Sequence, residues 1–295
     1  MKKRLLISGV LFLCLTVPFG ATVFAYNGMV SFGDSLSDNG PADGYGLGVW
    51  SNGPVWVDYL AADLGVGLLD MAYGGARTDY HPATDSEVWG FGWQVDEYIN
   101  NIGTTNHDTL YTVWIGGNDL LNISGDPVPV ITNAVTNISL GINSLIGAGA
   151  ENILVMNMPN LGATPYLNGQ NLEYGFYDDP VGGEMLADAF NDALDLALTP
   201  YRTAINLFEV DVFSLMEEWA AEELFDNHVN MLIVNQPTDD SYMFWDAIHP
   251  TTYAHSFIAQ AAFDEVASVP EPAIVLLLGT AFLALAGASR KKFMK

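Results

Sequence analysis

The sequence predicts an α/β fold built on a central parallel sheet, and three observations support this prediction. Half of the 295 residues are apolar, which is enough for one large core. Apolar runs typical of buried strands recur along the chain, at residues 28–32, 66–73, 109–115, 152–158 and 205–213. Longer segments with helical spacing lie between several of these runs. Strands that alternate with helices form parallel sheets with right-handed crossovers, so one domain of this class is expected.

The first three predicted strands end in stretches that suit a binding site. The first leads into "GDSLSDNG" at 33–40, the second into "GGART" at 74–78 and the third into "GGND" at 116–119. Turns are rich in Gly, Asp, Ser and Asn, so a simple turn explains the composition of each stretch. Ligands of open parallel sheets bind outside the carboxyl ends of the strands. These three stretches are therefore candidates for one shared site.

Helices are predicted in three further segments. The segment 126–149 opens with an Asp-Pro pair, which is a helix start signal, and similar spacing marks 183–198 and 254–266. The segment 166–183 is polar, Gly-rich and aromatic. We expect it to be a loop over the site.

Residues 1–25 are predicted to be a secretory signal peptide. A basic start precedes an apolar run, and Val23 and Ala25 provide a cleavage site. A first transmembrane helix is the alternative, but a proline and a glycine interrupt the run. The chain's one cysteine, Cys14, lies inside this segment. The mature protein is therefore expected to hold no disulfide and no thiol.

Residues 269–295 are predicted to be a sorting tail. Val-Pro-Glu-Pro leads into seventeen apolar or small residues at 273–289, and a basic end follows. A helix of that length just crosses a hydrocarbon layer, and the basic end should stay cytoplasmic. A plain tail anchor would have the same charge pattern. The three-part end resembles the PEP-CTERM sorting signals of Gram-negative bacteria, which implies that a membrane protease removes the tail during export.

The predicted domain between these ends, residues 26–268, is strongly acidic. It keeps two basic residues, Arg77 and Arg202, and 34 of the 35 acidic residues, so its net charge is −32. Such a surface repels phosphate backbones and anionic headgroups, which argues against nucleic-acid binding. We interpret the charge as favouring solubility in a salty medium, with divalent-cation binding at acidic loops as the alternative. No run of acidic, Asn and Gly residues has the spacing of a calcium loop. No cofactor is predicted.

Ser35 is the candidate nucleophile because it directly follows a buried strand. A serine hydroxyl needs a base at neutral pH. Among the five histidines, His249 has the strongest context, three residues after Asp246 and just before a proline. In an Asp-x-x-His turn the carboxylate orients one ring nitrogen while the other faces the hydroxyl. His255 is expected to be a packing or surface residue of the following helix.

Acyl transfer also needs hydrogen-bond donors for an oxyanion. Asn118 follows the third predicted strand and Gly75 follows the second, so the Asn118 amide and the Gly75 N–H are placed to converge with the N–H of Ser35. Gly74 is the alternative to Gly75. A tight turn with Asn and Asp as caps is the competing explanation for the stretch around Asn118.

Four sequence blocks, "FGDSLSDNG", "AYGGA", "IGGND" and "FWDAIHP", resemble those of the GDSL, or SGNH, hydrolases. Two more, "SNGPVWVDYLA" and "MPNLGATP", resemble the plant-lipase-like and lecithinase-like branch of that family. The resemblance covers residues 28–266. It implies a three-layer α/β/α flavodoxin-like fold and no metal. It also implies that Ser35 is the nucleophile, His249 the base and Asp246 the acid. The implied oxyanion donors are Ser35, Gly75 and Asn118.

Together these features predict a secreted serine ester hydrolase that works through an acyl-enzyme. Lipid or simple carboxylic esters are the first expected substrates, and O-acetyl groups of extracellular polysaccharide are the alternative. An inert matrix or surface protein that keeps the fold is the alternative of another class. The expected partners are the ester substrate, signal peptidase and a C-terminal sorting protease. The expected location is the surface or matrix of a Gram-negative bacterium, with transient membrane contact through residues 273–289 before processing.

Overall fold

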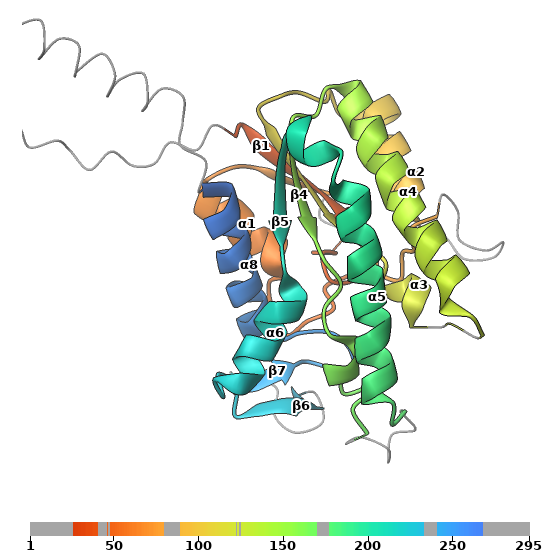
Figure 1. Ribbon diagram of the computed structural model, residues 1–295. Coiled ribbons are helices and arrows are strands. Elements are labelled where there is room, and N and C mark those ends of the chain that lie inside the picture. The colour runs from red at the N-terminus through yellow and green to blue at the C-terminus, as the bar shows by residue number, and fades with distance from the viewer. Residues whose placement is uncertain are drawn as a thin grey trace, which may run out of the picture.

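The computed structural model describes residues 26–40, 46, 48–79, 89–121, 123, 125–169, 177–232 and 241–267. A five-stranded parallel sheet of order β2-β1-β3-β4-β5 lies at the centre (Figure 1). Its strands are β1 (Gly28–Gly33), β2 (Leu68–Asp70), β3 (Thr109–Trp114), β4 (Asn152–Met156) and β5 (Asn206–Val210). This is the flavodoxin-like strand order. The chain adds β2 on one side of β1 and then β3, β4 and β5 on the other side, so the order reverses between β1 and β3. The predicted class and sheet are confirmed.

Helices cover both faces of the sheet and make three layers (Figure 1). One face carries α2 (Phe91–Glu97), α4 (Pro127–Ala148) and α5 (Pro180–Leu198), and the other carries α1 (Trp56–Leu64), α6 (Val212–Ala221) and α8 (Thr252–Ala267). Successive side chains of a strand point to opposite faces. Thus Val30 and Phe32 enter the core under α4 and α5, whereas Met29 enters the core under α1 and α8. The predicted three-layer α/β/α arrangement is present.

Three of these helices begin at an aspartate that accepts a hydrogen bond from a backbone N–H of the first turn. Asp126 caps α4, Asp179 caps α5 and Asp211 caps α6, each with an oxygen 3.0 Å from the donor nitrogen. Such caps satisfy N–H groups that have no partner within the helix. The helix predicted over 126–149 is found in α4, whose C-cap Gly149 has a φ of 113°.

Several predicted bounds are wrong in part. The runs at 66–73 and 152–158 form shorter strands, β2 and β4. The strand predicted over 205–213 ends at Val210, because Asp211 already caps α6. The loop predicted over 166–183 is shorter at its end, because α5 begins at Pro180. Residues 170–176 of that loop lie outside the described residues.

A second, two-stranded parallel sheet joins β6 (Asn227–Met231) to β7 (Tyr242–Phe244). The sequence did not predict it. The chain leaves β7 into a tight loop in which Trp245 N–H donates to the His249 carbonyl at 2.8 Å. An isolated bridge between Phe244 and Pro250 closes the same loop. The described residues also include shorter elements, namely a π-helix at Tyr98–Ile102, α3 (Gly117–Leu120) and 3-10 turns at Leu161–Ala163 and Tyr201–Thr203.

The predicted signal peptide and the predicted tail, including residues 273–289, lie outside the described residues. Within the described ranges, no helix combines the length and the apolar character needed to cross a membrane.

Candidate active site

Ser35 lies just beyond the carboxyl end of β1. The carbonyl oxygen of Asp34 accepts hydrogen bonds from the N–H groups of Ser37 and Asp38, at 3.0 and 2.9 Å, so the chain turns sharply around Ser35. Gly33 permits this turn, because a Cβ at that position would lie 2.6 Å from the Trp114 carbonyl oxygen of β3. The strand end, the turn and the neighbouring strand therefore hold the Ser35 hydroxyl at the sheet edge.

The loop after β7 brings His249 to this hydroxyl. Nε2 of His249 lies 2.7 Å from Ser35 Oγ, although the two residues are 214 positions apart in the chain. Nδ1 of the same ring lies 2.7 and 2.9 Å from the two carboxylate oxygens of Asp246. Asp246 Oδ1 also accepts the backbone N–H groups of Ile248 and His249, at 3.0 and 2.8 Å. The three predicted residues thus form one continuous hydrogen-bonded chain.

The charge state of Asp246 fixes the orientation of the imidazole. Burial raises the pKa of this carboxyl, but the hydrogen bond from the His249 ring, its positive charge and the two backbone N–H groups outweigh burial and lower the pKa. The carboxylate is therefore ionised at neutral pH and accepts the Nδ1 proton. Nε2 is then left as the acceptor that faces Ser35 Oγ.

Asn118 lies in α3, at the carboxyl end of β3. Ser35, Asn118 and His249 line the same small cavity of about 40 Å³. One N–H of the Asn118 amide donates to the Ala76 carbonyl at 2.9 Å, which ties α3 to the turn after β2. The predicted donor is therefore beside the predicted nucleophile.

The turn after β2 contains both candidate glycines, Gly74 and Gly75, and their N–H groups differ in hydrogen bonding. Gly74 N–H already donates to Asp38 Oδ2 at 2.8 Å, in a buried hydrogen bond. Gly75 is exposed, has a φ of 83° and, among the described residues, donates its N–H to no partner. A free donor is what an oxyanion requires. The geometry therefore favours Gly75 over Gly74, although Gly75 is outside the lining of the 40 Å³ cavity.

Trp50 is a site residue that the sequence did not predict. Its ring centroid lies 5.4 Å from that of His249, at an interplanar angle of 31°. A Cβ added to Gly74 would come 2.4 Å from the Trp50 indole nitrogen, so the indole also covers the turn after β2. The side chain remains 38% exposed. The one sequence signal that could have pointed to Trp50 is its position directly before the family block "SNGPVWVDYLA".

Asp34 is a second unpredicted neighbour of the nucleophile. It is buried and lines the same cavity as Ser35. The pKa of its carboxyl is raised to about 7, chiefly by burial. The hydrogen bond from Leu36 N–H and the nearby His249 lower this pKa, whereas the carboxylates of Asp119 and Asp38 raise it. Burial therefore favours the uncharged form of the Asp34 carboxyl.

His255 lies on α8 with its side chain fully buried, so it is a packing residue. Within the described part of the chain, neither ring nitrogen has a hydrogen-bond partner. Burial, with a smaller contribution from His249, lowers its pKa to about 3 and keeps the ring neutral. No three His, Cys, Asp or Glu side chains of the described residues are grouped to hold a metal ion.

Comparison with protein families shows which family the chain belongs to. The family model described as GDSL-like Lipase/Acylhydrolase matches residues 29–262, which is most of the chain. The chain belongs to this family. A second model, the PEP-CTERM protein-sorting motif, matches residues 268–291 and indicates an exported protein. The predicted resemblance is confirmed in both parts, whereas the domain boundaries after residues 25 and 268 stay predictions.

Similar curated proteins include enzymes and a toxin. The chain is 25% identical to the thermolabile hemolysin of Vibrio parahaemolyticus over 83% of its own length and 65% of the hemolysin. It is 25% identical to the phosphatidylcholine-sterol acyltransferase of Aeromonas hydrophila, over 84% and 92% of the two chains. With lipase 1 of Photorhabdus luminescens the identity is 30%, over 52% of this chain but only 25% of the lipase.

Among solved structures, the carbohydrate acetylesterase Est24 from Sinorhizobium meliloti is similar in fold. Its TM-score is 0.50 at 14% identity, and the match covers 82% of this chain and 99% of that chain. At such low identity the likeness concerns the fold alone.

Proposed function

We propose that this chain is an exported serine ester hydrolase. The observation that carries the proposal is the chain of hydrogen bonds from Ser35 Oγ through His249 to Asp246, at 2.7 Å on each side of the ring. It occurs at the carboxyl edge of the sheet, between β1 and β3, where this strand order places ligands. Membership of the lipase and acylhydrolase family supports the same chemistry.

In this mechanism Ser35 Oγ attacks the acyl carbonyl while His249 Nε2 takes its proton. The negative charge that develops on the carbonyl oxygen receives hydrogen bonds from the N–H of Ser35, the N–H of Gly75 and the second N–H of the Asn118 amide. The imidazolium, held by ionised Asp246, then protonates the leaving alcohol. Water repeats the sequence on the acyl-enzyme and releases the acid.

The substrate proposed first is a lipid or simple carboxylic ester. Relatives named as a lipase and as a phosphatidylcholine-sterol acyltransferase support this class. The second candidate is an O-acetyl group of extracellular polysaccharide. An acetylesterase of Thermothelomyces thermophilus, 27% identical over 56% of this chain, supports it, as does the small volume of about 40 Å³ at Ser35.

The proposed route to this substrate is export. Signal peptidase would remove residues 1–25, the membrane would hold the chain through residues 273–289, and a sorting protease would then release the tail that begins at residue 269. The matched sorting motif supports this route. The destination proposed is the surface or matrix of a Gram-negative bacterium.

A fluorophosphonate probe tests the reaction class, because it labels only an activated serine. We expect the purified protein to be labelled at Ser35 and to hydrolyse p-nitrophenyl esters. Ser35→Ala and His249→Ala should each abolish turnover in a protein that still folds, since removing one member of a triad costs nearly as much activity as removing all three. An inert matrix protein would show neither labelling nor turnover, and that result would refute the proposal.

A further inference from the structure

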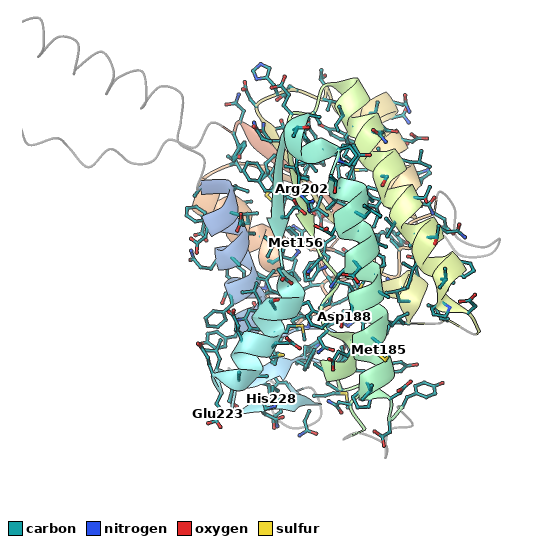
Figure 2. The ribbon with its side chains drawn as sticks, in the orientation of Figure 1. Met156, Met185, Asp188, Arg202, Glu223 and His228 are labelled. Atoms are coloured by element: carbon teal, nitrogen blue, oxygen red, sulfur yellow. The ribbon has the colours of Figure 1, made fainter. Side chains whose placement is uncertain are left out.

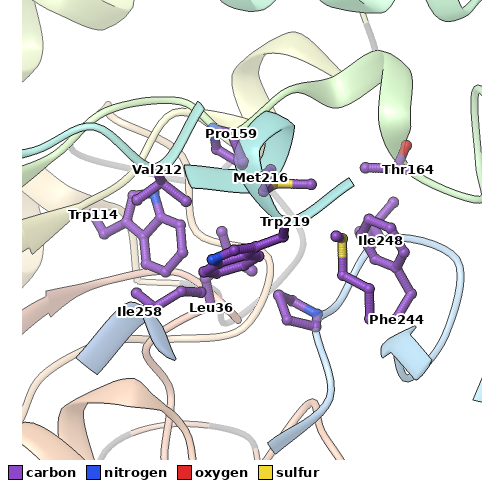
Figure 3. Close-up of a pocket in the computed structure, with 12 residues that line it drawn as sticks. Leu36, Trp114, Pro159, Thr164, Val212, Met216, Trp219, Phe244, Ile248 and Ile258 are labelled. Atoms are coloured by element: carbon purple, nitrogen blue, oxygen red, sulfur yellow. The ribbon is translucent and has the colours of Figure 1, made fainter. Parts of the chain in front are cut away.

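The cavity at Ser35 is too small to hold a long acyl chain. Any longer acyl chain must therefore extend from it into a neighbouring space. Two other cavities share walls with it. One, of about 20 Å³, shares Leu36 and Ile248 with it, and Figure 3 shows Met216 and Trp219 of α6 among its lining side chains. That volume holds little more than one water-sized group. A chain of several carbons does not fit there.

The other space is a groove of about 510 Å³ on the α5 side of the site. Leu121 and Leu161 line both this groove and the Ser35 cavity, so they form the boundary between the two. Its described walls come from the segment after β3 (Leu120, Leu121, Ile123, Gly125, Pro127), from Leu161, Tyr166 and Leu167, and from Tyr177 and the start of α5. The volume is in the usual range for sites that bind small molecules.

Most of the described side chains that line the groove are aliphatic or aromatic. Leu120, Ile123, Leu167 and Leu186 contribute aliphatic side chains, and the rings of Tyr166 and Tyr177 pack edge to face at 5.3 Å. Among the described lining residues the one charged side chain is Asp179. Its carboxylate already accepts the Gly182 N–H at 3.0 Å as the cap of α5. An alkyl chain needs no polar partner, and the aliphatic side chains of this lining offer it apolar contact.

Exposed apolar side chains form a rim next to lining residues of the groove. Val128, Val181 and Met185 are 63%, 65% and 66% exposed, and each is adjacent in the chain to a lining residue. Figure 2 shows Met185 near the first turns of α5. Such a rim suits a substrate presented by an apolar phase. The net charge of −32 in the predicted domain disfavours anionic lipid, so the fitting substrate has no net negative charge.

We propose that this groove, bounded by Leu121 and Leu161 and walled by Leu186, binds the acyl chain of an uncharged or zwitterionic lipid ester. This assignment rests on the proposed function, because it places the chain relative to an acyl group on Ser35. It makes a longer acyl chain, and not acetate, the preferred substrate.

The test is the dependence of kcat/KM on acyl length, with p-nitrophenyl acetate, butyrate, hexanoate and octanoate. Each buried methylene should raise kcat/KM about fourfold. Leu186→Trp fills the groove from α5, and Leu167→Trp fills it from the segment before α5, so a folding failure of one variant leaves the other to decide. Each should lower the octanoate to acetate ratio at least tenfold. Leu196→Trp is the matched control, on the same helix but 75% exposed and away from the lining, and should keep the wild-type ratio.

The outcomes separate this assignment from the proposed function. If Ser35 is labelled and acetate is hydrolysed, but octanoate gives no higher kcat/KM or both tryptophan variants keep the wild-type ratio, the groove assignment is overturned and the hydrolase stands. A higher kcat/KM on acetylated xylan than on octanoate would also overturn it. If Ser35 is not labelled and no ester is hydrolysed, the proposed function fails and the assignment fails with it.

Discussion

Replacing Asn118 by alanine removes the proposed donor to the oxyanion and a structural hydrogen bond at the same time. One amide N–H is bound to the Ala76 carbonyl at 2.9 Å, which leaves the other N–H for the substrate. Loss of one oxyanion donor costs about 2.7–4 kcal/mol of transition-state stabilisation, or roughly 10²–10³ in kcat. Loss of the Ala76 hydrogen bond adds about 0.5–1.5 kcal/mol of lost folding stability. We therefore expect a large fall in kcat with a small fall in melting temperature.

The assay is steady-state hydrolysis of a soluble ester, with kcat and KM measured separately, alongside thermal unfolding. Asn118→Asp keeps the shape but offers no N–H, so it should lose at least as much kcat as Asn118→Ala. Asn100→Ala is the matched control, because Asn100 is an exposed asparagine that also donates one hydrogen bond to a carbonyl, that of Asp96. A kcat for Asn118→Ala within threefold of the wild type would show that Asn118 is only a turn cap.

Two other variants test the residues around the nucleophile. Folding raises the pKa of Asp34 from 3.8 to about 7. Between pH 3.8 and about 7 the folded state therefore keeps a proton on Asp34 that the unfolded state has lost. The free energy of unfolding falls as pH rises through this window. Asp34→Asn should therefore gain stability over the wild type at pH 8 and not at pH 4 in urea unfolding, and an equal difference at both pH values would contradict this origin. The face of the Trp50 ring favours an imidazolium by about 0.5–1 kcal/mol. Trp50→Leu should accordingly lower kcat/KM about two- to fivefold while Trp50→Phe retains it; equal activity of the two variants would leave the aromatic ring without a role.

The hydrogen-bonded chain at the site was predictable because its parts are local patterns. Asp246 and His249 are three residues apart, and Ser35 follows a strand that the apolar run marks. Parallel strands bring their carboxyl ends to one edge, so strand ends that are far apart in the chain meet there. Neither step requires knowledge of the packing.

Contacts that depend on packing were not predictable. Trp50 reaches His249 across 199 positions, and no spacing rule connects an aromatic residue to a histidine at that distance. The choice between Gly74 and Gly75 depends on Asp38, whose side chain takes the N–H of Gly74 only in the folded chain. The end of β5 was a different case, since Asp211 is a recognisable cap but apolar residues on both sides hid it.

Features that cost stability gather around Ser35. Asp34 is buried beside it, and at neutral pH this carboxyl must either hold a proton or be ionised out of contact with water. Gly75 and Gly116, at the ends of the two neighbouring strands, have φ values of 83° and 120° that other residues adopt only at a cost. Stability alone would select against a buried carboxyl at this position. Its place next to the nucleophile, at the edge where Asn118 and His249 converge, therefore indicates that this edge is shaped for chemistry at the expense of stability.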